Sequence, residues 1–524
     1  MKKPLILALA VAGIGSAYTA FSWYFGKQTE TNLGAQYEYL LQSSPYVEIV
    51  QRDYRRGVFA SDETLTLELF GKIIKAAANG QDIQAPVPAE PLRLTIRTHI
   101  QHGPLPGGSK LAAAIAESEL VLPEKVGQEV EKLLGSATPL YTQRSVINFD
   151  GSGHATFSSP KFQFTTPRDP AGNTGTLSWQ GIEGSMDFSA DMKHLLMTAR
   201  APEMNFSADD GTTIRLADLR LEGDQQSLFD DLPIFFSGAQ HLSLGELAIT
   251  PPRDKGGPVI LKQVAYDTEL PVNGDYIDLV ARLSAENLQV EDKSFGPIHL
   301  DYSFRHLHTR ALAELAQAFM GLYSDPALLA EDPDALATQF MPILNEHGST
   351  LLNNSPEFHI DRISFANADG EANLAARVRM NALNLQDAAE NPLMVLSKIE
   401  ASGELSLQEE MILSLLRNPP AKEQLGIAEL SQQEMEAQGQ MLTAQFQQQV
   451  AMLSEQGYIT REGGLIKTNV EYKAGQILVN GKPFMPMPMP MPMDEGMPMD
   501  ENLSLDESMP MDEATPPAMV PDNR

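Results

Sequence analysis

The chain has 524 residues, of which 42% are hydrophobic, enough to bury a sizeable core in two or three domains and to exclude a chain that is disordered throughout. Its formal charge of −31 argues against nucleic acid and anionic lipid surfaces as main partners, because both would repel it. The absence of cysteine excludes structural disulfides and thiolate metal sites.

The first 27 residues predict a signal-anchor transmembrane helix. Residues 4–25 carry no charged side chain and are long enough to cross the core of a bilayer. Lysines precede this stretch and only Lys27 follows closely, so the positive-inside bias places the N-terminus in the cytoplasm and the body in the periplasm. The aromatic run at residues 23–25 is typical of the membrane interface. We therefore expect a single-pass protein of a bacterial inner membrane.

A cleaved signal peptide is the alternative interpretation of this segment. Its cleavage site would need small side chains at the −3 and −1 positions. The end of the apolar stretch, residues 18–24, suits that requirement poorly because it is rich in aromatic residues. The sequence therefore favours an uncleaved anchor.

Alternating apolar and polar residues predict β-rich regions over residues 28–308 and 349–484. The most regular alternation lies at residues 466–473, where a period of two buries one face and leaves the other in water, as in an antiparallel sheet. This pattern assigns Val470 to the core. The predicted strands are residues 64–70, 92–100, 213–221, 241–249, 276–283, 298–304, 374–383, 399–407, 466–472 and 476–479, the last two joined by a turn at Ala474-Gly475.

Helical patterns interrupt these strands. A broken pair of helices is predicted at residues 112–119 and 125–134, and residues 309–348 form a helical insertion with helices at 309–323 and 335–345. A long, Gln-rich helix follows near the C-terminus. Its apolar stripe consists of Met435, Leu442, Phe446, Val450 and Leu453. We expect this helix to cover its own sheet; pairing with another chain, as in a homodimer, is the alternative.

Residues 485–524 differ abruptly in composition from the rest of the chain. They alternate Met and Pro and then add repeated Asp-Glu pairs, so proline and charge together prevent a packed core. We predict a disordered tail that serves as a solvated spacer or docks a partner. Because thioether sulfurs suit Cu(I), copper binding is the alternative for this Met-rich tract. No cofactor or metal site is otherwise predicted.

Several short motifs follow one another in a recognisable order. Residues 54–61 (YRRGVFAS) lead into the first long strand, residues 102–104 (HGP) end the next, residues 295–297 (FGP) precede another, and residues 479–483 (VNGKP) close the final hairpin. In this order they resemble the YdgA-like family of bacterial envelope proteins of unknown function, over residues 1–484. The resemblance implies an inner-membrane anchor and a periplasmic body, and it supplies no catalytic residues.

The glycines of these motifs have a structural interpretation. Gly57 is expected to turn the chain before the first long strand. Gly103-Pro104 and Gly296-Pro297 are expected to end strands, because glycine permits unusual dihedral angles and proline fixes the exit. Asn480-Gly481 is a turn signal.

The ten histidines give no convincing ligand set. His99 and His102 lie three residues apart on a predicted strand, so they point to opposite faces. His306 and His308 share a face if their segment is extended, and Asp301 could complete a site with them. Surface or satisfied histidines are the simpler interpretation, which we prefer.

Motifs for catalysis are equally weak. The sequence contains no His-Glu-x-x-His, no Gly-x-Ser-x-Gly and no P-loop, and residues 103–108 (GPLPGG) lack the Lys-Ser/Thr of a phosphate cradle. The carboxylate pairs Asp209-Asp210 and Asp230-Asp231 are expected in solvated turns. We therefore predict no catalytic, cofactor-binding or metal-binding residues.

The sequence predicts a mainly β protein with helical insertions: an extended, mostly antiparallel, twisted sheet behind one N-terminal transmembrane helix. The expected role is that of a non-enzymatic envelope protein, a scaffold or a lipid-handling protein whose apolar sheet face forms a groove. The first alternative is an interaction module that docks an envelope protein through the long helix and the tail. The second is a hydrolase with a site that motifs do not reveal.

Overall fold

The computed structural model describes residues 18–31, 47–71, 91–123, 139–166, 172–252, 256–324, 340–385, 391–417 and 432–484, apart from short gaps at 109, 233–234 and 292, together with a few residues between these ranges. The chain divides into two units, residues 1–483 and 484–524, and every element named below belongs to the first.

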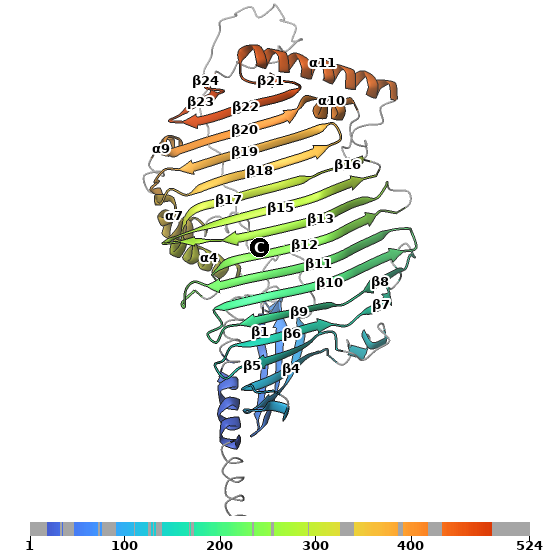
Figure 1. Cartoon of the computed structure of the whole chain (residues 1–524), viewed down its shortest axis with the longest axis vertical. Helices are drawn as coiled ribbons and strands as arrows, with labels where there is room; N and C mark the ends of the chain where they lie inside the picture. Colours follow the sequence, from blue (N-terminus) through green and yellow to red (C-terminus); the bar gives the residue numbers. More distant parts are fainter. Residues whose placement is uncertain are drawn as a thin grey trace, which may run out of the picture. The chain divides into compact units, whose positions relative to one another are not determined.

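The described residues of the first unit form one 24-stranded sheet. Almost every strand pairs antiparallel with the next strand along the chain, so the sheet is a long meander (Figure 1). Most strands reach their partner through a short connection, and a few connections are long and contain helices.

The strands of the first half are β1 Val47–Arg56, β2 Ala60–Leu69, β3 Leu92–His102, β4 Ala114–Val121, β5 Thr142–Ile147, β6 Gly153–Ser159, β7 Phe162–Thr165, β8 Gly175–Trp179, β9 Ile182–Phe188, β10 His194–Ala208, β11 Thr213–Ser227 and β12 Phe236–Thr250. Those of the second half are β13 Val259–Leu270, β14 Val272–Asn273, β15 Tyr276–Val290, β16 Lys293–Phe295, β17 Ile298–His308, β18 Glu357–Asn367, β19 Gly370–Met380, β20 Ile399–Gln408, β21 Thr460–Glu462, β22 Leu465–Lys473, β23 Gln476–Val479 and β24 Lys482–Pro483.

Helices interrupt the meander at a few connections. The described helical elements are η1 Pro106–Gly108, α4 Thr309–Ser324, η2 Leu344–Gly348, α7 Ser349–Asn353, α9 Pro392–Lys398, α10 Glu409–Arg417 and α11 Gln432–Gln456, in addition to the helical residues 18–31, here called the N-terminal helix. Within the described ranges, none of the helices combines the length and the apolar character needed to span a membrane. The apolar residues 4–17 of the predicted anchor lie outside the described residues.

The predicted mainly β, antiparallel architecture is confirmed. All ten predicted strands fall on observed strands, and the predicted helix at 309–323 is α4. Both turn predictions also hold, since Ala474-Gly475 and Asn480-Gly481 have positive φ angles between 49° and 81°. The predicted helices at 125–134 and 335–345, like the tail at 485–524, lie partly or wholly outside the described residues.

Two sequence predictions about local structure are wrong. The predicted helix at 112–119 is largely strand β4, which pairs with β3 on one side and β5 on the other. Its Ala-rich composition favours helix intrinsically, but pairing on both edges outweighs that preference. Val470 was assigned to the core, yet 39% of its surface is exposed.

The apolar stripe predicted for the long helix is only partly correct. Val450 is buried at 5% exposure and Leu453 is half-buried, whereas Leu442 is 36% exposed. The helix, α11, contacts α10 at Gly439, where an added Cβ would lie 3.0 Å from the Leu416 carbonyl oxygen. Because α11 packs against another helix here, the side chains that it buries differ from the predicted stripe.

A line of unpaired residues crosses the middle of the sheet. Asp218, Gly245, Gln263 and Glu286 lie on four successive strands, each between ladder pairs that skip it. Asp218 and Gln263 have φ angles of 55° and 49°, in the left-handed region. The ladders keep the same register on both sides of these residues, so each stands opposite one residue of the next strand and none is a β-bulge with an extra residue.

The sequence changes phase at Asp218. In β11 the apolar residues are Ile214 and Leu216 before Asp218, but Leu219 and Leu221 after it. The change of phase in the sequence thus falls at the line of unpaired residues.

Candidate functional site

One face of the sheet carries long rows of apolar side chains, and it is here called the apolar face. Residues directly paired across strands share a face, so the ladders define each row. The central row consists of Ala199, Leu221, Leu242, Tyr266, Leu283, Leu300, Ile363, Leu374, Leu405 and Thr468. The row beside it consists of Ala201, Leu219, Leu244, Val264, Ala285, Ile298, Phe365, Ala372, Leu407 and Ile466.

The residues between these two rows point to the opposite, polar face. They are Arg220, Ser243, Ala265, Ser284, His299, Ser364, Asn373, Ser406 and Lys467. Apolar and polar side chains are thus separated across the sheet over β11 to β22 without a charged side chain in either apolar row.

The apolar face is open to solvent over the middle of the sheet. Leu242, Leu283, Leu300 and Leu405 are 36% to 38% exposed, so no second layer seals them. The central row crosses ten strands, and at a spacing of roughly 4.8 Å it extends for about 43 Å. An apolar surface of this length on a chain in water is expected to bind something apolar.

The central row changes character toward the N-terminal strands. Beyond Ala199 it continues through Gly184 and Phe157 and then becomes polar. Its polar members are Gln143, Ser118, Thr98, Glu63 and Tyr54. Here the side chains are covered: Glu63 is 1% exposed and Thr98 is 7% exposed.

Several buried polar groups of this end are hydrogen-bonded to one another. The Arg52 Nε donates to Glu63 Oε1 at 2.7 Å, and the hydroxyls of Thr98 and Ser118 lie 2.9 Å apart. The Arg52 side chain keeps 31% of its surface in solvent while that of Glu63 keeps none. A buried carboxylate held by a half-exposed arginine is a structural ion pair rather than a group free to exchange protons with a substrate.

The N-terminal helix packs on this end through His102. The His102 Nδ1 donates to the Ser22 carbonyl oxygen at 2.8 Å, which leaves Nε2 to accept from the Ser61 hydroxyl at 3.0 Å. Gly26 lies directly over the ring, where a Cβ would be 2.7 Å from the ring carbon Cε1. Gly103, with φ of 127°, makes room for the Ser22 side chain.

A serine hydroxyl bonded to a histidine is also the arrangement of an activated nucleophile. Ser61 and His102 are each 1% exposed, however, so a substrate has no access to the hydroxyl. Burial lowers the pKa of His102, and hydrogen bonds with the main chain of Ser22 and Ala60 offset only part of that effect. The neutral ring therefore serves as the joint between helix and sheet.

The polar face carries repeated pairs of histidine and aspartate. Each pair joins neighbouring strands at 2.6 Å or 2.7 Å: His99 with Asp62, His154 with Asp187, His194 with Asp224, and His241 with Asp267. All are exposed, so each contributes little to stability. In the part of the chain that the structure describes, no three His, Asp or Glu side chains gather as metal ligands.

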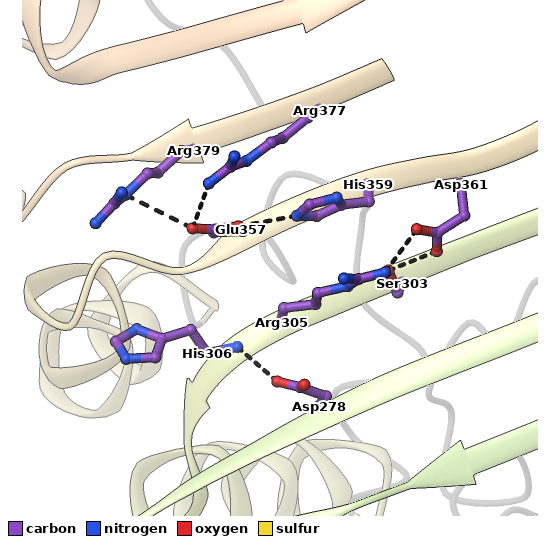
Figure 2. Close-up of polar contacts among 9 residues, drawn as sticks. All are labelled: Asp278, Ser303, Arg305, His306, Glu357, His359, Asp361, Arg377 and Arg379. Atoms are coloured by element: carbon purple, nitrogen blue, oxygen red, sulfur yellow. Dashed lines mark hydrogen bonds and ion pairs between the residues drawn. The ribbon is translucent and has the colours of Figure 1, made fainter. Parts of the chain in front are cut away.

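A denser ionic cluster lies on the polar face of β17, β18 and β19 (Figure 2). Glu357 accepts from His359 at 2.9 Å and from Arg377 at 2.8 Å, and Arg305 binds Asp361 at 2.6 Å. Burial alone raises the pKa of Glu357, but the hydrogen bonds from His359 and Arg377 outweigh it and lower the pKa. An ionised carboxylate that accepts two hydrogen bonds is a poor proton donor or acceptor. The cluster instead stabilises the pairing of the strands.

A hollow of about 690 Å³ lies on the polar face over the N-terminal strands. Its arginines are already paired, Arg97 with Glu119 at 3.0 Å and Arg144 with Glu117 at 3.3 Å. With both arginines paired and Glu183 also in its lining, the hollow carries three carboxylates against two arginines and is not suited to an anion.

The structure separates the histidines that the sequence analysis compared. His99 and His102 point to opposite faces, as predicted: one is exposed beside Asp62 and the other is buried. His306 has φ of 58°, stacks on Tyr276 with ring centroids 3.9 Å apart, and bonds the Asn354 carbonyl.

His308 accepts a hydrogen bond from the Ala311 amide at the start of α4. Asp301 pairs across the strands with Arg282 and Arg362 instead, so the three residues considered together in the sequence do not form a site.

The aspartate pairs lie in turns, as predicted. Asp209 accepts from the amide and hydroxyl of Thr174, which lower the pKa of its carboxyl group. Asp231 binds Arg310 at 2.6 Å, and Asp230 pairs with Lys193.

The sequence analysis did not predict that two of the motif segments quoted above lie in contact. The segment that contains Ser61 and the segment that contains His102 meet each other and the N-terminal helix at one joint. Gly57 turns the chain next to it, donating its amide to the Ala60 carbonyl at 2.9 Å. The signal was present, since both segments carry a glycine directly beside a polar residue, but the contact spans 80 residues of sequence.

The comparisons with known proteins agree with a bacterial origin and add no activity. An uncharacterized protein of Haemophilus influenzae is 20% identical over 342 residues, which is 62% of this chain and 87% of that protein. No solved structure matches the chain. The YdgA-like name and the membrane anchor that it implies stay predictions. The family model described as "Bacterial protein of unknown function (DUF945)" matches residues 1–487, and the chain therefore belongs to that bacterial family.

Proposed function

We propose that this chain is a non-catalytic protein of the bacterial envelope that holds lipid acyl chains on its apolar face. The single observation that carries the proposal is the central apolar row, in which Leu242, Leu283, Leu300 and Leu405 remain more than a third exposed. The hydrocarbon core of a bilayer is about 30 Å thick, so one leaflet of acyl chains spans about 15 Å. A row of about 43 Å has room for more than one such chain laid along it.

The address follows from the sequence. The uncharged segment at residues 4–25, preceded by lysines, supports an inner-membrane anchor with the body in the periplasm. The charge of −31 would repel an anionic membrane surface from most of the body, so uptake by the apolar face depends on burial of acyl chains rather than on headgroup charge.

Within the described residues, the polar groups that resemble catalytic pairs are buried or already bonded, which supports a binding role. The Ser61–His102 pair and the Glu63 carboxylate are buried, and in the ionic cluster of Figure 2 Glu357 and Asp361 are bonded to cations or hydroxyls.

A photo-crosslinking residue at Leu283 tests this proposal directly. Leu283 lies in the central apolar row, and Ser284 beside it points to the polar face, so the same residue at Ser284 is the matched control. In cells that produce the full chain, we expect phospholipid adducts, identified by mass spectrometry, at position 283 and not at 284. Equal labelling at both positions, or no lipid adduct at 283, would rule out a lipid-binding face.

A protein-docking function is the second candidate, and α11 supplies the observation that favours it. Met441 and Met452 on this helix are 53% and 40% exposed, and adaptable methionines suit protein surfaces. Protein adducts at 441, together with protein rather than lipid adducts at 283, would favour this alternative.

A further inference from the structure

Three loops at one end of the N-terminal strands expose large apolar side chains. The loops join β1 to β2 (57–59), β3 to β4 (103–113) and β5 to β6 (148–152), and in an antiparallel meander alternate connections lie at the same end. Their exposed residues are Val58 at 44%, Phe59 at 51%, Leu105 at 38%, Leu111 at 73% and Phe149 at 47%. These three segments are here called the loop collar.

The loop collar contacts the N-terminal helix. The rings of Tyr18 and Phe59 are 5.9 Å apart, and the Tyr18 hydroxyl donates to the Leu105 carbonyl oxygen at 3.0 Å. The rings of Phe25 and Phe149 are 5.2 Å apart. The N-terminal helix thus contacts all three loops of the collar. Figure 1 draws this helix beside the N-terminal strands.

The helix begins, within the described residues, at its contact with the collar. Tyr18 is the residue beside Phe59 and Leu105, and the preceding residues 4–17 contain no charged side chain. The apolar stretch thus leads into the helix at the place where the loops expose their apolar residues.

The charges near the collar suit the surface of a bilayer. Trp23 is 47% exposed and has two cations over its ring, Lys27 at 5.9 Å and Arg56 at 5.3 Å. A tryptophan flanked by cations is typical of the headgroup level, where the ring enters the apolar boundary and the cations meet phosphate.

We propose that the loop collar inserts its apolar tips into the outer boundary of the bilayer that holds the N-terminal segment. The proposal rests on the membrane anchor of the proposed function and adds a second, independent contact with lipid. Because Leu111, Phe59 and Phe149 are already exposed, insertion requires no unfolding. It fixes the N-terminal strands, at the end that carries the collar, against the membrane.

Single cysteines can test the collar cleanly because the chain has none of its own. Leu111→Cys places a fluorophore in the collar. Leu92→Cys is the matched control: Leu92 is an equally apolar residue, 49% exposed, at the opposite end of β3. The 11 residues of β3 separate the two ends by roughly 33 Å. Both full-length variants are labelled with bimane and reconstituted into phosphatidylethanolamine–phosphatidylglycerol liposomes that contain spin-labelled phospholipid.

We expect spin-labelled lipid to quench the label at position 111 several-fold more strongly than the label at 92. Equal quenching at both sites, or none at 111, overturns the proposal. A blue shift at 111 without quenching by lipid also overturns it, because it would indicate burial against another protein chain. A second variant, Phe149→Asp, should reduce quenching at 111 while leaving the circular dichroism spectrum unchanged.

This test is separable from the test of lipid carriage. Lipid adducts at Leu283 without quenching at 111 would leave the apolar face as a lipid site and remove the collar. Quenching at 111 without adducts at 283 would leave a docked protein that carries no lipid.

Discussion

The N-terminal end and the middle of a single cross-strand row differ sharply in composition and in packing. At the N-terminal end the row holds Tyr54, Glu63 and Thr98, which are buried or half-buried, and the last two are hydrogen-bonded. In the middle it holds Leu242 and Leu283, which are more than a third exposed. The usual pairing of polar with exposed and apolar with buried is thus inverted along one row.

This inversion shows that the sheet does two different things. The N-terminal end is closed by a helix, and its buried Glu63 and Thr98 side chains each have a hydrogen-bond partner. Among the described residues, the middle lacks such a cover over its large side chains, so its apolar residues do not form a sealed core there. Exposed leucines in continuous rows are more readily explained by a ligand than by stability.

The largest expected effect separates a closed from an open position on the same face. Ile100 is fully buried, so Ile100→Ala should cost about 3 kcal/mol through lost burial and a cavity. Leu283→Ala removes a side chain that is 37% exposed and should cost about 1 kcal/mol. Hydrogen exchange of peptides from β3 and β15 in the full chain measures both, and similar losses would mean that the two regions are packed alike.

The joint between helix and sheet should be sensitive to a side chain added at Gly26. In Gly26→Leu the new side chain meets the His102 ring, so the helix must move, at a cost of about 2 kcal/mol. Gln28→Leu, on an exposed position of the same helix, is the control. Faster exchange of the His102 amide, which donates to the Phe59 carbonyl at 2.9 Å, is the measurement. Unchanged exchange in Gly26→Leu would show that the helix is not held there.

The closed end should also respond to pH, unlike the open middle. Because burial lowers the pKa of His102 below its unfolded value of 6.5, the folded state resists protonation. The associated stability is complete above that unfolded pKa and is lost as the pH falls below it.

Wild-type peptides around β3 should therefore exchange faster at about pH 5.5 than at about pH 7.5, after correction for intrinsic exchange rates. The variant His102→Gln should show a smaller difference. Equal differences in the two proteins would remove His102 as the cause.

The smallest effect concerns the line of unpaired residues that crosses the sheet. Gln263 has a φ angle of 49°, which costs an ordinary residue about 1 kcal/mol relative to glycine. Gln263→Gly should therefore stabilise β13 by about 0.5 kcal/mol, and the β-branched Gln263→Val should destabilise it by about 1 kcal/mol. Thermal unfolding of the full chain would reveal the sign; stabilisation by valine would mean that residue 263 does not adopt the left-handed backbone conformation.

Several features could be predicted from the sequence because they depend on neighbours along the chain. The alternation at residues 466–473 and the turn at Ala474-Gly475 gave a correct hairpin, since both partners lie within a few residues. The segment at residues 112–119 was assigned wrongly because helix propensity is local, while the pairing of β4 with β3 and β5 is not.

The sequence by itself determined the antiparallel β architecture, because side-chain alternation in consecutive strands needs no distant information. It also contained the change of phase at Asp218, but nothing along the chain shows that this change falls on a line of unpaired residues. Only the tertiary structure decided that the unpaired residues of neighbouring strands align and that Val470 is exposed. Only the fold, likewise, brings His102 to the Ser22 carbonyl, because burial and hydrogen bonding depend on segments that meet across long stretches of sequence.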